Sequence, residues 1–147
     1  MGIWLMTWFF TLLIPGTMIF FGFLWKKRPP KNRNCLYGYR TARSGKSQAS
    51  WDFAHLKIGR IWRIWGMVSL LLSAAVFFLG SLAFARWEPG NLGASECVDA
   101  FNWLSLGLVA AQLLLLMVSI FPVERALKRL FDENGNPWGP EAGRRKM

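Results

Sequence analysis

The chain has 147 residues, of which 53% are hydrophobic and 16% aromatic, and its formal net charge is +10. A soluble domain of this length would alternate apolar and polar positions, whereas here the apolar residues form long blocks without charge, as is typical of a membrane protein. Basic residues that flank membrane spans explain the positive charge, so we expect no nucleic-acid partner. The sequence predicts a single all-α integral membrane domain over residues 1–147.

The first charge-free block covers residues 2–25. About 20 helical residues cross the ~30 Å hydrocarbon layer, so this block is long enough to span it. Its basic residues follow it instead of preceding it, and we therefore expect a retained span and not a cleaved signal peptide. Pro15 lies within this span. A proline inside a membrane helix is tolerated if neighbouring groups bond to the carbonyl that it leaves without a helical partner. A harmless bend and a functional hinge are both open interpretations of Pro15.

The loop at residues 26–63 is strongly basic, and Asp52 is its only acid. Basic residues in short loops resist translocation, so we expect this loop in the cytoplasm and the N-terminus outside. Its cations are Lys26, Lys27, Arg28, Lys31, Arg33, Arg40, Arg43, Lys46, Lys57, Arg60 and Arg63.

The second half of this loop predicts a basic amphipathic helix that Ser47 can cap. It leads without a breaker into a second charge-free span at residues 64–85. The helix either lies in the membrane interface or continues the span as one long helix. Its apolar residues recur at helical spacing: Trp51, Ala54, Ile58, Ile61, Trp62 and Trp65.

The third span is predicted at residues 101–121. The connection at residues 86–100 has one cation against three acids, which places it outside, and the basic tail at residues 122–147 is expected in the cytoplasm. The chain is thus predicted to be a multi-pass protein of the cell membrane. Cys35 and Cys97 fall in loops on opposite sides, so no internal disulfide is expected.

Polar residues within the spans are few, and none of them is ionisable, which argues against ion-coupled transport by this chain alone. Gln112 is expected to bond a neighbouring helix, and Gly107 with Ala111 offers a small-residue contact that leaves a homo-oligomer open. Several tryptophans near the span ends are expected to lie at headgroup level: Trp4, Trp8, Trp25, Trp65, Trp87 and Trp103.

After Pro122 the tail predicts an amphipathic helix with an apolar face that includes Val123 and Leu127. It ends at residues 132–135, where Asn134-Gly135 indicates a turn with positive φ. That tetrapeptide lacks the further ligand positions of a calcium loop. Neither cysteine has a partner at zinc-ligand spacing, so no metal and no cofactor are expected.

The most specific pattern is an ordered set of residues in the basic loop: Asn34, Gly38, Arg40, Thr41, Ser44, Trp51, Ala54 and Gly59. It resembles the signature of the SdpI family of bacterial membrane proteins, and the stretch at residues 124–135 looks like that family's tail. The resemblance implies immunity to a secreted, membrane-active peptide toxin, and some members also recruit a repressor to the membrane. Larger members carry additional spans ahead of this module.

The signature is physically plausible as an anchored polar loop that also includes Tyr39. Gly38 permits a backbone conformation that a side chain forbids, and Thr41 and Ser44 can cap local N–H groups. The planar fork of Arg40 suits a carboxylate or a phosphate, and we predict it as the ligand-facing residue. Pairing within the protein, a lipid phosphate and a distinct ligand are the three open partners of Arg40.

Asp52 and His55 are three residues apart and share a helix face. This is the spacing of a general-base pair or of half a metal site, yet no nucleophile accompanies it. We therefore predict no catalytic residue. The resemblance to the family favours an immunity protein. A signalling module that recruits a cytoplasmic repressor is one alternative, and a lipid-acting enzyme or small-solute carrier that uses this pair is another.

Overall fold

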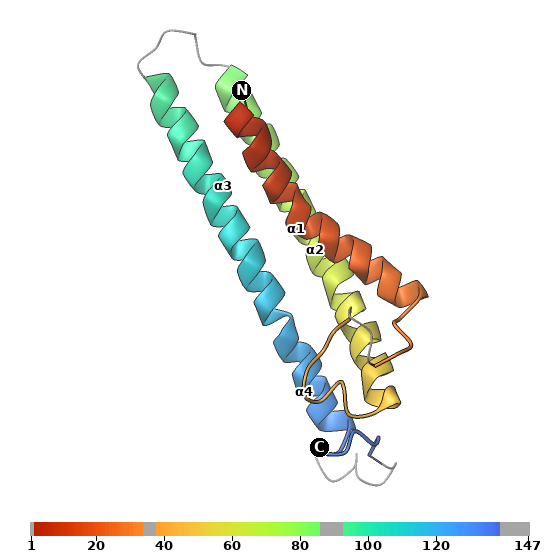
Figure 1. Cartoon of the computed structure of the whole chain (residues 1–147). Coiled ribbons are helices and arrows are strands. Elements are labelled where there is room, and N and C mark those ends of the chain that lie inside the picture. The colour runs from red at the N-terminus through yellow and green to blue at the C-terminus, as the bar shows by residue number, and fades with distance from the viewer. Residues whose placement is uncertain (1, 34–37, 86–92, 139–147) are drawn as a thin grey trace. The chain divides into compact units, whose positions relative to one another are not determined.

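A computed structural model describes residues 2–33, 38–85 and 93–138 of the chain (Figure 1). Four helices follow one another: α1 at Gly2–Lys27, α2 at Gln48–Ala85, α3 at Gly93–Val118 and α4 at Ile120–Leu130. In those three ranges the only extended pairing is an isolated bridge between Phe131 and Pro137. The predicted all-α class is confirmed.

Three stretches of helix are long and apolar enough to cross a membrane: Met6–Lys27, Gln48–Leu82 and Val98–Leu130. The predicted three spans are thereby confirmed as helices of suitable length and composition. The amphipathic segment after Ser47 belongs to α2, so the alternative of one long helix is the correct one.

Helix α2 is longer than a membrane requires. Its 38 residues correspond to ~57 Å of helix, against a hydrocarbon layer of ~30 Å. The cations Lys57, Arg60 and Arg63 all lie in its first half, where they are costly to place in hydrocarbon. The charge-free second half from Ile64 onward is therefore the spanning part, and residues 48–63 project beyond the hydrocarbon.

The C-terminal helices differ from the prediction in their boundaries. Helix α3 begins at Gly93, inside the predicted loop at residues 86–100, because a helix can continue past the apolar segment that crosses the layer. The break before α4 lies at Ser119 and not at Pro122. Proline removes the bond to the carbonyl four residues earlier, at Val118, so the interruption appears upstream of the proline itself.

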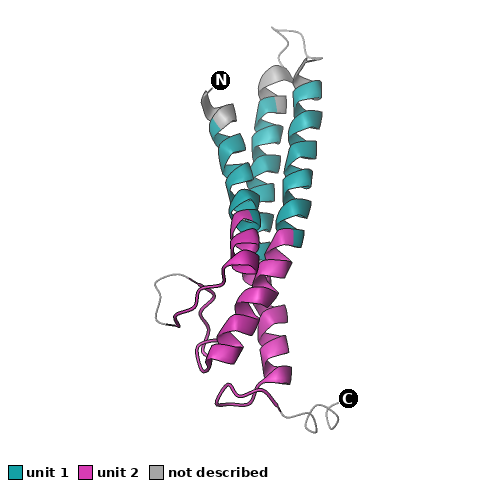
Figure 2. Cartoon of the chain, turned by 90° about the vertical axis from the view of Figure 1, so that its right-hand side faces the viewer, with its two compact units in different colours: residues 1–19, 64–116 teal, residues 20–63, 117–147 magenta. Residues whose placement is uncertain are grey.

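The chain divides into two compact units, coloured separately in Figure 2. Unit 1 comprises residues 1–19 and 64–116, and unit 2 comprises residues 20–63 and 117–147. The expectation of one membrane domain stays a prediction beside this division.

Unit 1 holds its helices together with one buried amide. Gln112 of α3 is 1% exposed, and its Nε2 donates to Thr11 O at 3.2 Å and to Ser73 Oγ at 2.9 Å. Thr11 O is the carbonyl that Pro15 leaves without its helical partner, four residues along α1. The predictions that Gln112 bonds a neighbouring helix and that a neighbour satisfies the proline-freed carbonyl are both confirmed.

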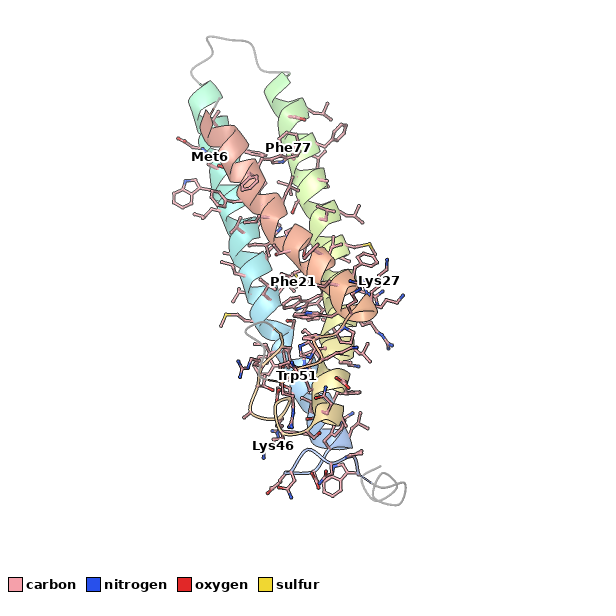
Figure 3. The ribbon with its side chains drawn as sticks, turned by 45° about the vertical axis from the view of Figure 1, so that its right-hand side comes forward. Met6, Phe21, Lys27, Lys46, Trp51 and Phe77 are labelled. Carbon is pink, nitrogen blue, oxygen red and sulfur yellow. The ribbon has the colours of Figure 1, made fainter. Side chains whose placement is uncertain are left out.

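Close apolar contacts add to this packing in unit 1. A Cβ on Gly66 would lie 2.9 Å from Ile19 Cγ1, so α1 and α2 approach at this glycine. Trp8 of α1 packs against Phe77 of α2, which is labelled in Figure 3. Large apolar side chains such as Leu71 face outward, as they do where lipid is the solvent.

Unit 2 has its own core, to which both of its chain segments contribute. Within it α1 and α2 approach each other closely at two glycines. A Cβ added to Gly59 would lie 3.3 Å from Gly22 O. Trp25 is 4% exposed and packs on Trp62, and its expected place at headgroup level stays a prediction. The buried apolar residues are Trp25, Tyr39, Ala54, Ile58, Val123, Leu127 and Phe131.

Candidate functional site

The signature residues of the basic loop fold into a hydrogen-bonded turn. Ser44 is fully buried, and its Oγ donates to Tyr39 O at 3.0 Å while accepting from the N–H of Thr41 at 2.9 Å. The N–H of Ser44 donates in return to Thr41 Oγ1 at 3.2 Å. The hydroxyl oxygen of each residue thus accepts from the backbone N–H of the other, as the sequence predicted for Thr41 and Ser44.

The start of α2 is fixed by a reciprocal cap. Ser47 Oγ accepts from the N–H of Ser50 at 3.0 Å, and Ser50 Oγ accepts from the N–H of Ser47 at 3.1 Å. This is a capping box in which Ser50 takes the place of the usual Glu or Gln. The predicted cap by Ser47 is confirmed. Ser50 Oγ also donates to Ser44 O at 3.1 Å, so the cap and the preceding turn share one network.

The first turn of α2 reaches back to the end of α1 through Trp51. Its side chain is 1% exposed, and its Nε1 donates to Pro30 O at 2.6 Å. Gln48 Nε2 donates to Lys31 O at 3.0 Å and to Asp52 Oδ1 at 2.9 Å. The connection after α1 is therefore tied to α2 by two side chains that lie one helical turn apart or less.

His55 is fully buried at the centre of these contacts. Its Nε2 accepts from the N–H of Tyr39 at 2.8 Å, and its Nδ1 lies 2.8 Å from Trp51 O. A backbone N–H can only donate, so Nε2 carries no proton and Nδ1 must donate to the Trp51 carbonyl. The geometry therefore assigns a neutral imidazole with its proton on Nδ1. The rings of Trp25 and Trp51 pack against it at centroid distances of 5.2 and 4.4 Å.

Burial lowers the pKa of His55 below its ordinary value of 6.5. The bond to the Trp51 carbonyl and the charge of Asp52 act in the opposite direction but are smaller in effect. Burial disfavours the charged imidazolium, in agreement with the hydrogen bonds that require the neutral form. His55 is thus a structural hub that links the signature loop to α2.

Gly38 allows the loop to approach this histidine. Its φ is +135°, a conformation that only glycine adopts without strain. A Cβ at this position would lie 2.7 Å from His55 Nε2 and 3.1 Å from the ring of Trp51. The glycine in the signature is therefore required both for its backbone conformation and for space.

Tyr39 joins the loop to α4. Its hydroxyl lies 3.3 Å from Glu124 Oε1 and 3.4 Å from Ile120 O, to which it can donate. Burial raises the pKa of Tyr39 far above its ordinary value, and the neighbouring charge of Glu124 adds to this effect. The hydroxyl is therefore a permanent donor at physiological pH.

The tail after α4 forms a compact turn around Asp132. Its Oδ1 accepts from the N–H groups of Asn134 at 2.9 Å and Asn136 at 2.8 Å. These bonds, above all the one from Asn136, hold the pKa of this carboxyl below its usual range. Gly135 has φ +82°, which confirms the predicted turn with positive φ.

This tail turn docks on the cap of α2. Ser47 Oγ donates to Gly135 O, and Lys46 Nζ donates to Glu133 O. A Cβ on Gly135 would lie 3.0 Å from Ser47 N, so the contact is close. The two segments that carry the sequence signature, far apart in the chain, thus form one structure. We refer to residues 38–55 together with residues 131–136 as the motif cap.

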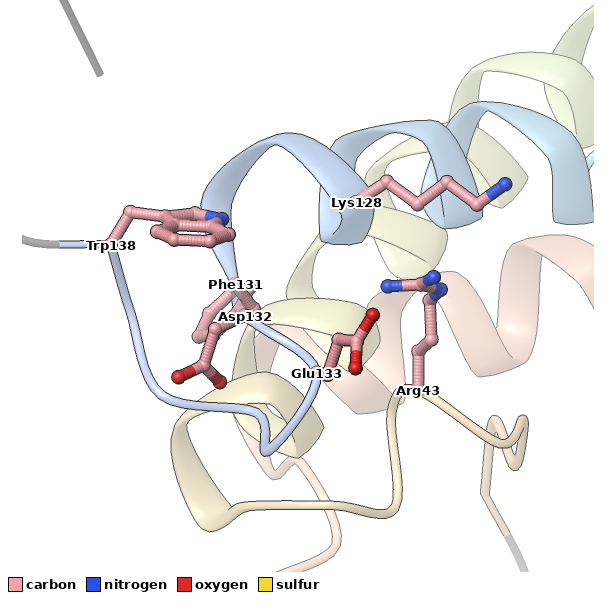
Figure 4. A pocket seen from close by; sticks show the side chains of 6 residues that line it. All are labelled: Arg43, Lys128, Phe131, Asp132, Glu133 and Trp138. Carbon is pink, nitrogen blue, oxygen red and sulfur yellow. The ribbon is translucent and has the colours of Figure 1, made fainter. Parts of the chain in front are cut away.

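A hollow of about 350 Å³ opens beside the tail turn (Figure 4). Figure 4 shows the guanidinium of Arg43 and the carboxylate of Glu133 pointing toward each other. Its charged lining residues comprise two cations and two acids, so its charge is balanced. The lining residues are Arg43, Lys128, Phe131, Asp132, Glu133 and Trp138.

Asp52 and His55 each bond to other groups, and the alternative that they act as a pair stays a hypothesis. Asp52 is bonded to Gln48, and both ring nitrogens of His55 are engaged by backbone groups. Arg40 is exposed, and its ligand-facing role stays a prediction. Asn34 and Cys35 lie outside the described residues, as does the side chain of Cys97.

Two contributors to the motif cap were not anticipated from the sequence. Ser50 could have been found from the Ser47-x-x-Ser50 spacing, which matches a capping box with an unusual fourth residue. Pro30 contributes a backbone carbonyl, for which no side-chain signal exists.

These observations define the class of the protein. It is a helical membrane protein with a folded polar cap that is built from an ordered set of signature residues. The model of the SdpI/YfhL protein family matches residues 31–123, more than half of the chain. The chain belongs to this family.

The chain is also similar to the protein YfhL of Bacillus subtilis (strain 168), which is described as uncharacterized. The two are 40% identical over 68 residues, which cover 44% of this chain and 62% of the relative. The match therefore spans less than two thirds of the relative's length. No solved structure matches the chain.

Proposed function

We propose that this protein confers immunity to a membrane-active peptide toxin and acts as an interaction protein, not as an enzyme. The observation that carries the proposal is the closed motif cap: its signature residues bond to one another around a neutral, saturated His55. Residues that bond to one another in this way hold the motif cap in one conformation. Its contribution to immunity is to hold the ends of the helices in one arrangement that the toxin meets.

The proposal includes an orientation. The strong excess of Lys and Arg in residues 26–63 supports a cytoplasmic motif cap and an N-terminus outside the cell. In this orientation a toxin that arrives from outside first meets the apolar spans. The motif cap then acts from the inner side.

Expression of the full chain in a sensitive host tests the proposal. The challenge is a panel of membrane-permeabilising peptides, namely nisin, gramicidin and melittin. Survival against at least one peptide is expected with the native chain and is expected to be lost with Gly38→Val, which disrupts the motif cap. Gly107→Ala is the matched control, since nothing lies within 4 Å of an added Cβ there. Equal survival with and without expression across the panel would contradict the immunity function.

A signalling module that recruits a cytoplasmic partner is the second candidate. The hollow of Figure 4 favours it, because charges of both signs and the half-exposed ring of Trp138 converge there. Truncation at Pro122 is unsuitable as a test, since Val123 and Leu127 are buried in the core of unit 2. Trp138→Ala with Arg43→Gln is the suitable variant. A protein that co-purifies with the native chain and is lost with this variant, while immunity is absent, would favour recruitment.

A further inference from the structure

A second groove in unit 2 differs from the hollow of Figure 4 in its charge. It is lined by α2 through Lys57 and by one face of α4, and it encloses about 410 Å³. Three of its lining residues are cations and none is an acid. They are accompanied by three apolar residues, and the complete lining is Lys57, Pro122, Arg125, Ala126, Arg129 and Leu130.

The periodicity of α4 explains why all charged residues on this face are cations. Positions 122, 125, 126, 129 and 130 share one face of an α-helix, since they are three and four residues apart. The acid of α4, Glu124, lies on another face, where the hydroxyl of Tyr39 contacts it. The buried positions Val123 and Leu127 hold the helix in this rotation. The two arginines are therefore presented together, without a neutralising carboxylate among the lining residues.

The position of the groove along its helices is that of lipid headgroups. Arg125 follows the last apolar residue of the third span, Phe121, by about 6 Å of helix rise. Lys57 precedes the charge-free part of α2 by about 10 Å. The headgroup region is about 5 to 8 Å thick on each side of the hydrocarbon, and long basic side chains reach several ångströms along it.

The apolar part of the groove leads toward the same membrane boundary. Pro122 and Leu130 line it, and Leu130 is 47% exposed. Ile120 and Phe121, directly before the groove, are 42% and 63% exposed. A ligand that joins a negative phosphate to long hydrocarbon chains would match both the cations and this apolar surface.

We propose that the groove of Lys57, Arg125 and Arg129 binds the phosphate headgroup of an anionic glycerophospholipid. The two guanidinium groups donate to the phosphate oxygens, and Lys57 adds a third positive charge from the opposite wall. The acyl chains leave the groove past Phe121. This site is independent of toxin immunity, and a bound lipid would tie α4 to α2 at the membrane boundary.

The experiment uses the purified full chain in phosphatidylcholine nanodiscs, with phosphatidylglycerol as the titrated lipid and native mass spectrometry as the readout. Arg125→Gln with Arg129→Gln removes two charges from the groove. Arg43→Gln with Lys128→Gln removes two charges from the balanced hollow and serves as the matched control. The groove variant is expected to lose about tenfold in phosphatidylglycerol affinity, because charge-assisted hydrogen bonds are removed, and the control less than about twofold.

Each other outcome would overturn the proposal. An equal loss in both variants would mean that the lipid responds to total charge and not to a site. Displacement of phosphatidylglycerol by inorganic phosphate in excess would identify free phosphate as the ligand. Ala126→Glu provides a second test, since it places an acid among the cations at a partly exposed position without opening a cavity. Unchanged affinity with this variant would also contradict the lipid site.

Discussion

The two compact units differ in how their polar groups find partners. In unit 1 the side chain of Gln112 bonds three helices together, whereas the hydroxyls of Thr11 and Ser73 donate within their own helices. In unit 2 a dense network connects the signature loop, the cap of α2 and the tail turn. Helices in lipid satisfy their backbones internally, whereas a loop must find partners through side chains. Unit 2, which contains the irregular backbone, therefore requires particular polar side chains at particular positions.

The largest expected effect comes from Gly38→Ala, which breaks unit 2 at its most constrained point. Strain at φ +135° and the clash with His55 should destabilise unit 2 by about 3 kcal/mol or more. Thermal unfolding in detergent, with hydrogen exchange over residues 38–55, measures this loss. Gly107→Ala in α3 is the control and should be neutral or slightly stabilising. A stable Gly38→Ala protein would show that the motif cap is not tightly packed.

Ser47→Ala should have the next largest effect. It removes the cap of α2 and the bond to Gly135 together, at a cost of about 2 kcal/mol. Ser81→Ala is the matched control, because the hydroxyl of Ser81 donates to Phe78 O within its own helix. The same unfolding measurement applies. Equal effects of the two substitutions would contradict the importance of the cap.

Gln112→Leu tests unit 1 in the same way. It leaves Thr11 O without a partner beside Pro15, and the expected loss is about 1 kcal/mol, as for other interhelical bonds in membranes. Hydrogen exchange around residues 11–15 should increase. A loss larger than that of Ser47→Ala would reverse the comparison between the two units.

The smallest expected effect is a pH dependence of unit 2. The pKa of His55 is lowered by folding, so the unfolded form binds the proton more readily below about pH 6.5. The stabilisation is thus complete above this pH and falls as the pH decreases, by at most about 0.7 kcal/mol between about pH 7 and 6. Denaturation at both pH values measures it. In His55→Gln the same decrease should disappear, and its persistence would assign the effect to another group.

Much of the architecture could be predicted because it depends on local properties of the sequence. Charge-free blocks identified the three spans, and the Ser47 cap and the Asn134-Gly135 turn followed from residue types. The start of α3 and the break at Ser119 were placed incorrectly. Composition marks where hydrocarbon ends but not where a helix ends, and the effect of Pro122 appears at an upstream carbonyl.

The site was only partly accessible from the sequence. The ordered signature identified the residues, yet their interactions are long-range: Tyr39 with Glu124, Ser47 with Gly135, and Trp51 with the carbonyl of Pro30. Spacing suggested that Asp52 and His55 act together, although each bonds elsewhere. A shared helix face brings two side chains near each other, but the groups that approach from other segments determine their bonds.

The sequence by itself determined the membrane class, the number of spans and which residues form the signature. These properties depend on apolar blocks and residue types, which can be recognised locally along the chain. Only the tertiary structure decided what the signature does: it buries His55 as a neutral hub and fits Gly38 against it. It also decided that Arg125 and Arg129 of α4 line one open groove. The hub at His55 depends on a contact with Tyr39, 16 residues away in the chain, and the rotation of α4 on the contact of Tyr39 with Glu124, 85 residues away; such contacts leave no periodic trace in the chain.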